Sequence, residues 1–239
     1  CIYVRPDAGI SEPADLRGKR IGLPQYGSTA GVFNKGLIQH EYGVPPSEIS
    51  WFMGGQDNPT PAPLAPLALP ADIHLEFIPE GATLEGMLDD RQLDALFATY
   101  IPKLFLNGSP NIVRLFPNFK EVEQDYYRRT GIFPIMHTVV IREDVHQENP
   151  WVAPSLYDAF THAKDLAVNR LYDTDALALT LPFLIDHVEE TWRIFGSDYW
   201  AYGVEPNRPA LEGLAQYVVD QGLAPRVVST EELFPEIAL

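Results

Sequence analysis

Residues 126–141 gather side chains that could hold an acidic ligand and exchange a proton with it. Arg128 and Arg129 are followed by Thr130 and, further on, by His137. A guanidinium group can bind a carboxylate through two parallel hydrogen bonds, and an imidazole changes its charge near neutral pH. The segment therefore indicates a site for an aromatic acid, with Arg129, Thr130 and His137 as candidates. Taken singly, each residue also fits a plainer interpretation: a surface arginine pair and a core histidine with a hydrogen-bond partner.

The turn at residues 26–30 is a second candidate site, and its ligand would be an anion. It lies between an expected strand and an expected helix, and Ser28 and Thr29 supply two hydroxyl groups. Unpaired amides at a helix N-terminus bind carboxylates and phosphates, and the glycines here let a ligand approach the backbone. Plain capping of the helix by Ser28 or Thr29 is the alternative. Tyr26, which opens the turn, and Tyr100, which follows a later strand, are further candidates for binding the ligand.

A third patch combines aromatic residues with a turn. Tyr199, Trp200 and Tyr202 precede a glycine, and Asn207 and Pro209 follow it. Asn207 is expected to cap a helix that has Pro209 just inside its start. Capping explains Asn207 fully but leaves the three aromatic residues unexplained. They could wall a pocket, and Tyr202 is the candidate for contact with a ligand.

No other group of residues has the spacing of a known catalytic or metal site. The six histidines include no pair with metal-ligand spacing within one element. The chain has no Gly-x-Ser-x-Gly motif, which marks the nucleophile of many hydrolases. Cys1 is the single cysteine, so an intrachain disulfide and a cysteine-based metal site are excluded. A metal held by residues distant in the sequence stays open.

The elements that must position these residues follow an α/β pattern. Strands are expected at residues 2–4, 20–23, 51–53, 73–78, 93–98, 112–115 and 137–141. Helices are expected at residues 30–41, 83–89, 119–127, 151–171, 176–179, 184–195 and 211–221. Residues 128–131 read as a turn, and residues 54–70 as a loop rich in proline and glycine. Strands that alternate with helices, followed by a helical tail, predict an α/β protein with largely parallel sheets.

Composition narrows the classes of partner. The 239 residues can form one large domain or two small lobes. The formal net charge of −16 disfavours nucleic acids and anionic membrane surfaces, and no apolar run approaches the roughly 20 residues that span a bilayer. A single cysteine fits a reducing cytoplasm. An acylated Cys1 would need a polar tether, but the residues after it read as a strand, so we expect a piece of a longer protein.

Three motifs carry a resemblance to a known family. They are ADLRGKRIG at residues 14–22, RTGIFPIMH at residues 129–137 and YGVEPNR at residues 202–208. Together they resemble the 4,5-dihydroxyphthalate decarboxylase family, and the similarity runs over the whole chain. The first motif is generic to binding proteins of this fold, whereas the other two are more specific.

The resemblance implies a two-lobed fold of the type II periplasmic-binding-protein class, in which two α/β lobes close on a ligand. Lobe two would comprise residues 15–128, and lobe one residues 1–14 and 129–239. Hinge strands would lie near residues 1–4 and 133–140. Family members carry further residues before the position of Cys1, so the N-terminal part of lobe one would be missing here.

The function implied by the resemblance is decarboxylation of a hydroxylated aromatic dicarboxylic acid. The expected reaction converts 4,5-dihydroxyphthalate to protocatechuate and carbon dioxide, a lyase step in phthalate degradation, without an organic cofactor. His137 would donate the proton, and Arg129 would clamp a carboxylate. Ser28 or Thr29 would form a second clamp, and Tyr202 an apolar wall.

A binding protein with no chemistry is the alternative. It would be the solute-binding component of an ABC-type transporter for a small organic or aromatic acid, with the same cleft. In either case the expected partner is a small aromatic acid, with no nucleic acid and no membrane, and a homo-oligomer stays open.

Overall fold

The computed structural model describes residues 1–61 and 67–234 and separates the chain into two compact units. Unit 1 comprises Cys1–Glu123 and Glu212–Val228, and unit 2 comprises Gln124–Leu211 and the residues from Ser229 onward. The lobe boundaries implied by the resemblance stay a prediction. Part of the expected loop at residues 54–70 lies outside the described residues.

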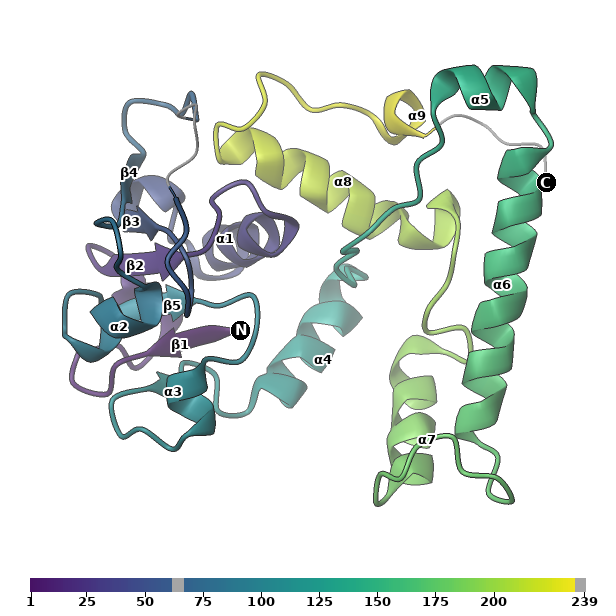
Figure 1. Cartoon of the computed structure of the whole chain (residues 1–239), viewed down its shortest axis with the longest axis horizontal. Helices are drawn as coiled ribbons and strands as arrows, with labels where there is room; N and C mark the ends of the chain where they lie inside the picture. Colours follow the sequence, from purple (N-terminus) through teal and green to yellow (C-terminus); the bar gives the residue numbers. More distant parts are fainter. Residues whose placement is uncertain (62–66, 235–239) are drawn as a thin grey trace. The chain divides into compact units, whose positions relative to one another are not determined.

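Unit 1 contains a mixed six-stranded sheet with the strand order β4-β3-β2-β5-β1-β6 (Figure 1). Strands β2, β3, β4 and β5 run parallel to one another, whereas β1 is antiparallel to both β5 and β6. The α/β class is therefore confirmed, with an antiparallel edge on a parallel centre. The strands are β1 (Ile2–Val4), β2 (Arg20–Leu23), β3 (Ser50–Met53), β4 (His74–Phe77), β5 (Ala95–Phe97) and β6 (Val113–Arg114).

Apolar side chains cover both faces of this sheet, as expected for central parallel strands. Ile21 and Trp51 belong to one core cluster, and Tyr3 and Leu96 belong to the other. The helical elements of unit 1 are α1 (Thr29–Tyr42), α2 (Leu84–Asp89), α3 (Lys103–Leu106) and the short 3₁₀ helices Pro13–Leu16 and Pro46–Glu48.

The caps of two helices in unit 1 confirm the signals in the sequence. The Ser28 hydroxyl accepts a hydrogen bond from the Gly31 amide at the start of α1. Gly43 ends that helix in the left-handed conformation, with a φ of 69°. Thr83 caps α2 in the same way as Ser28, through the Gly86 amide.

The C-terminal part of α8 (Val204–Asp220) packs against α1 within unit 1. Gly36 lets the ring of Tyr217 lie directly on α1, because a Cβ atom at this position would come within 2.3 Å of the ring. The pair is reinforced by a contact of 2.7 Å between His40 Nε2 and Asp220 Oδ2. This packing seats α1, and hence the turn before it, firmly on the core.

Unit 2 is helical. Its long helix α6 (Val152–Leu171) contacts α7 (Leu184–Phe195), and both confirm the expected periodic segments. The expected helix at residues 176–179 is wrong, because these residues form bends without helical hydrogen bonding. The other helices are α4 (Phe119–Thr130), which begins in unit 1, α5 (Glu143–Glu148) and α9 (Thr230–Leu233). No helix in the described ranges is long and apolar enough to cross a membrane.

Two helix boundaries differ from the expectation for physical reasons. Helix α8 begins at Val204, so Asn207 lies in its first turn. The Asn207 amide donates to the Ala201 and Gly203 carbonyl oxygens at 2.9 and 2.8 Å, so it closes the preceding turn.

Helix α4 continues to Thr130, so Arg128–Thr130 are helical and not a turn. Gly131, with a φ of 68°, ends the helix, and its amide donates to the Tyr127 carbonyl oxygen at 2.8 Å.

The expected strand at residues 137–141 is also wrong, and with it the hinge strand at residues 133–140. The segment has no regular secondary structure, and Val140 is 86% exposed. A strand requires a neighbour with which to share hydrogen bonds, and no described strand pairs with this segment. A β-branched composition alone was not enough to form a strand here.

Candidate functional site

The carboxyl ends of three neighbouring strands define the candidate site in unit 1. Strands β3, β2 and β5 are adjacent and parallel, so the loops that follow them lie at one edge of the sheet. Helix α1 connects β2 to β3, which is the neighbour of β2 on one side. Helix α2 leads into β5, which is the neighbour of β2 on the other side (Figure 1). In open α/β sheets, ligands bind at the carboxyl edge where the connections diverge in this way. Tyr26, Ser28, Thr29 and Tyr100 all belong to these loops.

The turn between β2 and α1 presents backbone amides that have no acceptor. Ser28 acts as a cap: its hydroxyl also donates to the Gln25 carbonyl oxygen at 2.9 Å. Within the part of the chain that the structure describes, no hydrogen bond is made by the amides of Gly27, Thr29 and Ala30. Capping by Ser28 is therefore correct, and it still leaves three amides at the positive end of a 14-residue helix. This arrangement suits a carboxylate.

Tyr26 contributes its backbone to this turn, because its ring lies in the core. The ring is fully buried and packs edge-on against Trp51, with 6.1 Å between ring centroids. Burial, together with the charge of Asp72, raises the pKa of the Tyr26 phenol. The phenol has no hydrogen-bond partner among the described residues.

Lys35 lies beside this turn, and sequence reasoning missed it. Its side chain is 1% exposed, and its Nζ donates to the Tyr26 carbonyl oxygen at 2.5 Å. The same nitrogen lies 3.2 Å from the centroid of the Tyr26 ring. Burial lowers the pKa of Lys35 to about 6. The available signal was its position on the buried face of α1, three residues after Val32 and three before Ile38.

A buried polar network holds the loop after β3 against the loop after β5. The Gln56 amide donates to the Tyr100 carbonyl oxygen at 3.0 Å and accepts from the Thr99 amide at 3.2 Å. Gln56 also donates to Glu85 at 3.3 Å, and Glu85 accepts from the Leu104 amide at 3.1 Å. Both Gln56 and Glu85 are buried. A satisfied network of this kind fixes the loops in one arrangement.

Tyr100, Asp57 and Lys103 form a charged group at the same edge. The Tyr100 hydroxyl donates to Asp57 Oδ1 at 2.5 Å, and Lys103 Nζ lies 2.7 Å from Asp57 Oδ2. The bond to Asp57 raises the pKa of Tyr100 to about 12. The bonds from Lys103 and Tyr100 lower the pKa of Asp57. The Tyr100 phenol therefore remains a neutral donor at physiological pH, and Asp57 remains a carboxylate.

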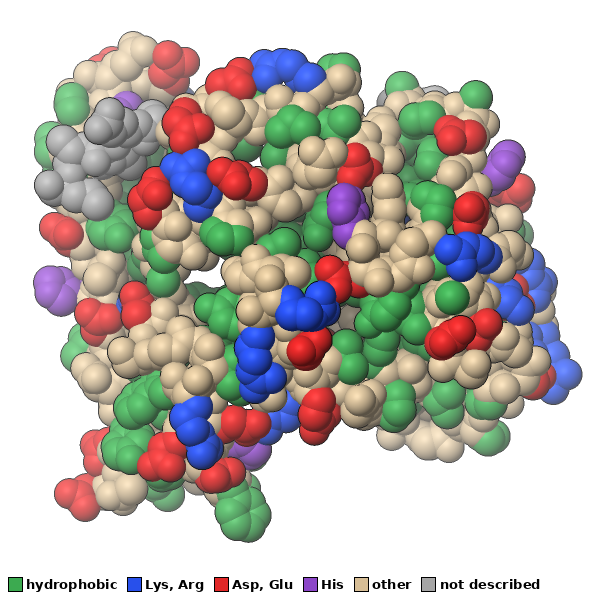
Figure 2. Space-filling model, turned by 180° about the vertical axis from the view of Figure 1, so that it is seen from behind, with side chains coloured by type: hydrophobic (Ala, Val, Ile, Leu, Met, Phe, Trp, Pro, Cys, Tyr) green, Lys and Arg blue, Asp and Glu red, His purple; other side chains and the backbone are tan. Residues whose placement is uncertain are grey.

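Positive side chains in unit 1 are largely engaged with carboxylates. Arg17 pairs with Glu48 at 2.7 Å, and Arg20 pairs with Asp94 at 2.8 Å. On the face drawn in Figure 2, Lys and Arg side chains are interspersed with Asp and Glu. Because these cations already have partners, the amides of the turn at residues 26–30 are the better-placed donors for an anion.

Unit 2 holds the remaining predicted residues. Arg129 lies near the end of α4, where its Nε donates to Asp125 Oδ2 at 2.8 Å. The Thr130 hydroxyl donates to the Tyr126 carbonyl oxygen at 2.7 Å and accepts from the Ile132 amide at 3.1 Å. The main role of Thr130 in the structure is therefore to shape the end of α4.

His137 is exposed in the segment that follows α4, and no hydrogen bond to it is found among the described residues. Tyr202 is half-buried, and its ring lies 5.3 Å from Lys164 Nζ. Arg129 and Thr130 are thus adjacent on one helix, and His137 and Tyr202 lie on other segments of unit 2. The residues in unit 1 and those in unit 2 are each described by themselves.

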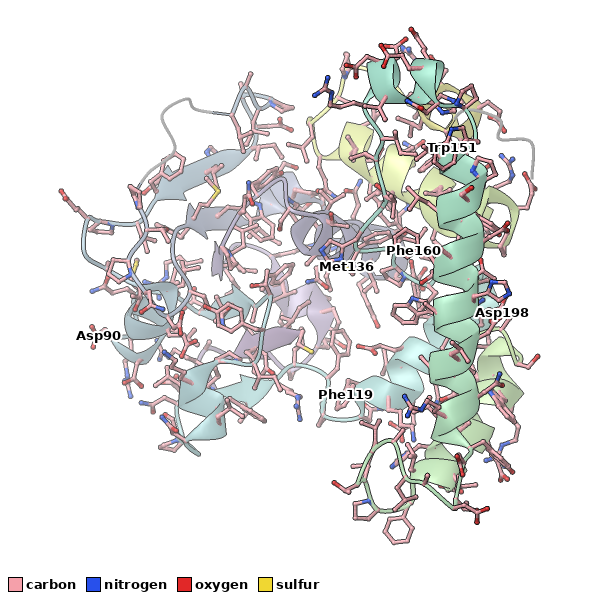
Figure 3. The ribbon with its side chains drawn as sticks, turned by 45° about the vertical axis from the view of Figure 1, so that its right-hand side comes forward. Asp90, Phe119, Met136, Trp151, Phe160 and Asp198 are labelled. Atoms are coloured by element: carbon pink, nitrogen blue, oxygen red, sulfur yellow. The ribbon has the colours of Figure 1, made fainter. Side chains whose placement is uncertain are left out.

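Aromatic residues gather in unit 2, as the composition of residues 199–202 suggested. The ring of Phe133 lies 5.3 Å from that of Phe195 and 5.5 Å from that of Trp200. Tyr199 and Trp200 also line a cavity of about 410 Å³ beside α6, together with Lys164 and Asp198. Figure 3 shows Asp198 next to this helix, and its Oδ1 lies 2.6 Å from Lys164 Nζ.

The structure was also searched for metal-binding groups. Within residues 1–61 and 67–234, no three His, Cys, Asp or Glu side chains gather in a way that could hold a metal ion.

Comparisons with known proteins identify relatives of one kind. A 4,5-dihydroxyphthalate decarboxylase from Comamonas testosteroni is 37% identical over 238 residues, which is 100% of this chain and 72% of that protein. A 4,5-dihydroxyphthalate decarboxylase from Pseudomonas putida is 38% identical over 127 residues, which is 53% of this chain and 49% of that protein. No protein-family model matches the chain.

Proposed function

Because the chain belongs to the 4,5-dihydroxyphthalate decarboxylase family, we propose that it releases carbon dioxide from 4,5-dihydroxyphthalate. The product would be protocatechuate, and the reaction would be a step in the breakdown of phthalates. The observation that carries this proposal is the 37% identity to a decarboxylase across the whole chain. It favours the lyase over a solute-binding component of a transporter.

The chemistry of the substrate sets three requirements. Each carboxylate of 4,5-dihydroxyphthalate has a hydroxyl group para to it. When this hydroxyl is deprotonated, its electrons can move through the ring to the carbon that bears the carboxylate. That carbon accepts a proton from a general acid, the bond to the carboxylate then breaks, and its electron pair restores the aromatic ring. The protein must therefore supply a proton, hold the retained carboxylate and surround the leaving one with apolar groups.

In unit 1, the turn at residues 26–30 binds the retained carboxylate in this proposal. The unpaired amides of Gly27, Thr29 and Ala30 are the donors, and the hydroxyl of Thr29 adds a further one. Tyr100, whose phenol stays protonated, would exchange its hydrogen bond to Asp57 for one to the substrate. The support for this assignment is that these groups lie at one edge of the sheet. They are hydrogen-bond donors, which favour an acidic ligand over a cation.

In unit 2, the proposal assigns the residues that the resemblance indicates. His137 donates the proton, Arg129 clamps a carboxylate, and Thr130 and Tyr202 contact the substrate. Arg129 would exchange its bond to Asp125 for a bond to the substrate. The two-lobed binding-protein fold and a cytoplasmic location also belong to this proposal, the former through the resemblance and the latter through the single cysteine.

The test is turnover by the purified protein. With 4,5-dihydroxyphthalate, we expect equal amounts of carbon dioxide and protocatechuate. Phthalate is the matched control: it keeps both carboxylates but lacks the para hydroxyls, so it should bind without releasing carbon dioxide. Tight binding of 4,5-dihydroxyphthalate with no release of carbon dioxide would contradict the proposal and support a binding protein.

A further inference from the structure

Lys35 occupies a position that is unfavourable for a lysine. Its side chain lies in the core of unit 1, at 1% exposure, and no described carboxylate forms an ion pair with it. Lysine is rarely buried without such a partner, because moving a charge out of water costs more than one hydrogen bond returns. The contacts of its ammonium group are the Tyr26 carbonyl oxygen and the rings of Tyr26 and Trp51.

Those contacts place Lys35 directly beneath the turn at residues 26–30. Its Nζ lies 2.5 Å from the Tyr26 carbonyl oxygen, so that carbonyl points into the core. The structure has no cis peptide bonds in its described part. In a trans peptide, the carbonyl and the following amide point in opposite directions. The Gly27 amide must therefore point away from the core, and Gly27 is exposed.

We propose that Lys35 is a positioning residue for substrate: by holding the Tyr26 carbonyl oxygen, it directs the Gly27 amide toward the carboxylate that the turn binds. This inference rests on the proposed function of the turn. Without Lys35, the peptide unit between Tyr26 and Gly27 can rotate, because glycine accepts a wide range of backbone angles. The turn would then lose one of its three unpaired donors and the fixed orientation of the others.

The test compares Lys35→Met with Lys19→Met in the natural protein. Methionine keeps an unbranched side chain and removes the donor. Lys19 is a matched control, because its Nζ also donates to a backbone oxygen in unit 1, that of Ala8, at 2.7 Å. With phthalate as the probe, calorimetry should show about tenfold weaker binding for Lys35→Met, the loss expected for one charge-assisted bond. Lys19→Met should bind phthalate as the wild type does.

Amide NMR separates a positioning role from a merely structural one. In the wild type, phthalate should shift the amide resonances of Gly27, Thr29 and Ala30. In Lys35→Met the shift of Gly27 should be lost, although the variant melts at or above the wild-type temperature because a buried amine has been removed. Unchanged affinity and an unchanged Gly27 shift in Lys35→Met would overturn the role of Lys35 and leave the anion site standing. If phthalate does not shift the amide resonances of the turn in the wild type, the anion site itself is overturned.

A measurement on the wild type keeps the test valid if Lys35→Met does not fold. The side-chain carbon next to the Lys35 nitrogen should change its resonance when phthalate binds, because a negative charge then arrives at the turn above it. The same carbon of Lys19 should not change. Equal responses of the two lysines, or no response of Lys35, would contradict the inference.

Discussion

The Tyr100 hydroxyl donates to Asp57 Oδ1 at 2.5 Å, and Lys103 approaches the other oxygen of the same carboxylate at 2.7 Å. The bond stabilises the neutral phenol, which is why the pKa of Tyr100 is raised to about 12. Asp57→Asn removes the negative charge that favours the neutral phenol. We expect the pKa of Tyr100 to fall toward 10.0, the ordinary value for tyrosine, in a pH titration of isotope-labelled tyrosine by NMR.

Tyr26 provides the internal control for this titration. Its pKa is raised mainly by burial and not by Asp57, so Asp57→Asn should leave the Tyr26 resonance unchanged. If the two tyrosines respond alike, the variant has loosened the whole unit. If neither responds, the bond between Tyr100 and Asp57 is absent in solution.

The cost of burying Lys35 predicts a specific dependence of stability on pH. The pKa of Lys35 is about 6 in the folded protein, whereas 10.5 is the ordinary value for a lysine. Between these values the unfolded chain binds a proton that the folded protein does not, so the free energy of unfolding rises with pH. The slope is up to about 1.4 kcal/mol per pH unit. Lys35→Met should remove it.

The measurement is urea unfolding of both proteins at several pH values from about 6 to about 9. Lys35→Met should be the more stable protein, with the largest difference near pH 6 and a decreasing difference as the pH rises. Lys19→Met, which changes a lysine outside the core, should keep the wild-type slope. A constant difference between Lys35→Met and the wild type would show that Lys35 stays protonated when buried.

Local signals were enough to predict most of unit 1. Its strands were expected from short apolar runs or from alternation of apolar residues, and the caps Ser28, Thr83 and Gly43 from the chemistry of one side chain. The strand expected at residues 137–141 failed because a strand depends on a hydrogen-bonding neighbour, which the local sequence does not specify. Lys35 was missed for a related reason: its charge suggested solvent, and only the packing of β3 against α1 shows that it is buried.

Two capping residues, Ser28 and Thr83, allow the effect of capping on stability to be separated from the effect of anion binding. Ser28→Ala should lower the free energy of unfolding by about 1 kcal/mol, because the Gly31 amide loses its acceptor. Thr83→Ala should cost a similar amount at the start of α2, where the hydroxyl accepts from Gly86. In phthalate titrations, however, Ser28→Ala should weaken binding, because the Ser28 hydroxyl also holds the Gln25 carbonyl oxygen and so shapes the turn that carries the donor amides. Thr83→Ala should not weaken it. Equal affinities for the two variants would assign Ser28 to capping alone.

Arg128 and Arg129 are consecutive on α4, and consecutive residues on a helix point about 100° apart. Only one of them can therefore face a given ligand, and the reason is the helix that replaces the turn expected from the sequence. Lysine cannot reproduce the two-pronged bond of arginine to a carboxylate. Arg129→Lys should raise the KM for 4,5-dihydroxyphthalate clearly more than Arg128→Lys does.

Asp125 offers a complementary variant for the same residue. Asp125→Asn weakens the ion pair that holds Arg129 at 2.8 Å, so the affinity for the dicarboxylate should increase modestly if Arg129 is the clamp. Equal increases in KM for the two arginine variants, together with no effect of Asp125→Asn, would mean that neither arginine binds the substrate.

His137 decides between an enzyme and a binding protein. It is exposed and has no described hydrogen-bond partner, so no described hydrogen bond holds its side chain away from a substrate. His137→Gln keeps a hydrogen-bonding side chain of similar reach but removes the group that can carry the proton. Loss of a positioned general acid costs about 10²–10⁴-fold in rate, and kcat should fall by that factor.

The affinity of His137→Gln for phthalate should change far less than its turnover, because in the proposal the charges that hold the substrate come from Arg129 and the turn amides. His162→Gln, on the exposed side of α6, is the control and should turn over normally. A His137→Gln variant with near-normal kcat would transfer the role of donor to another residue or to water.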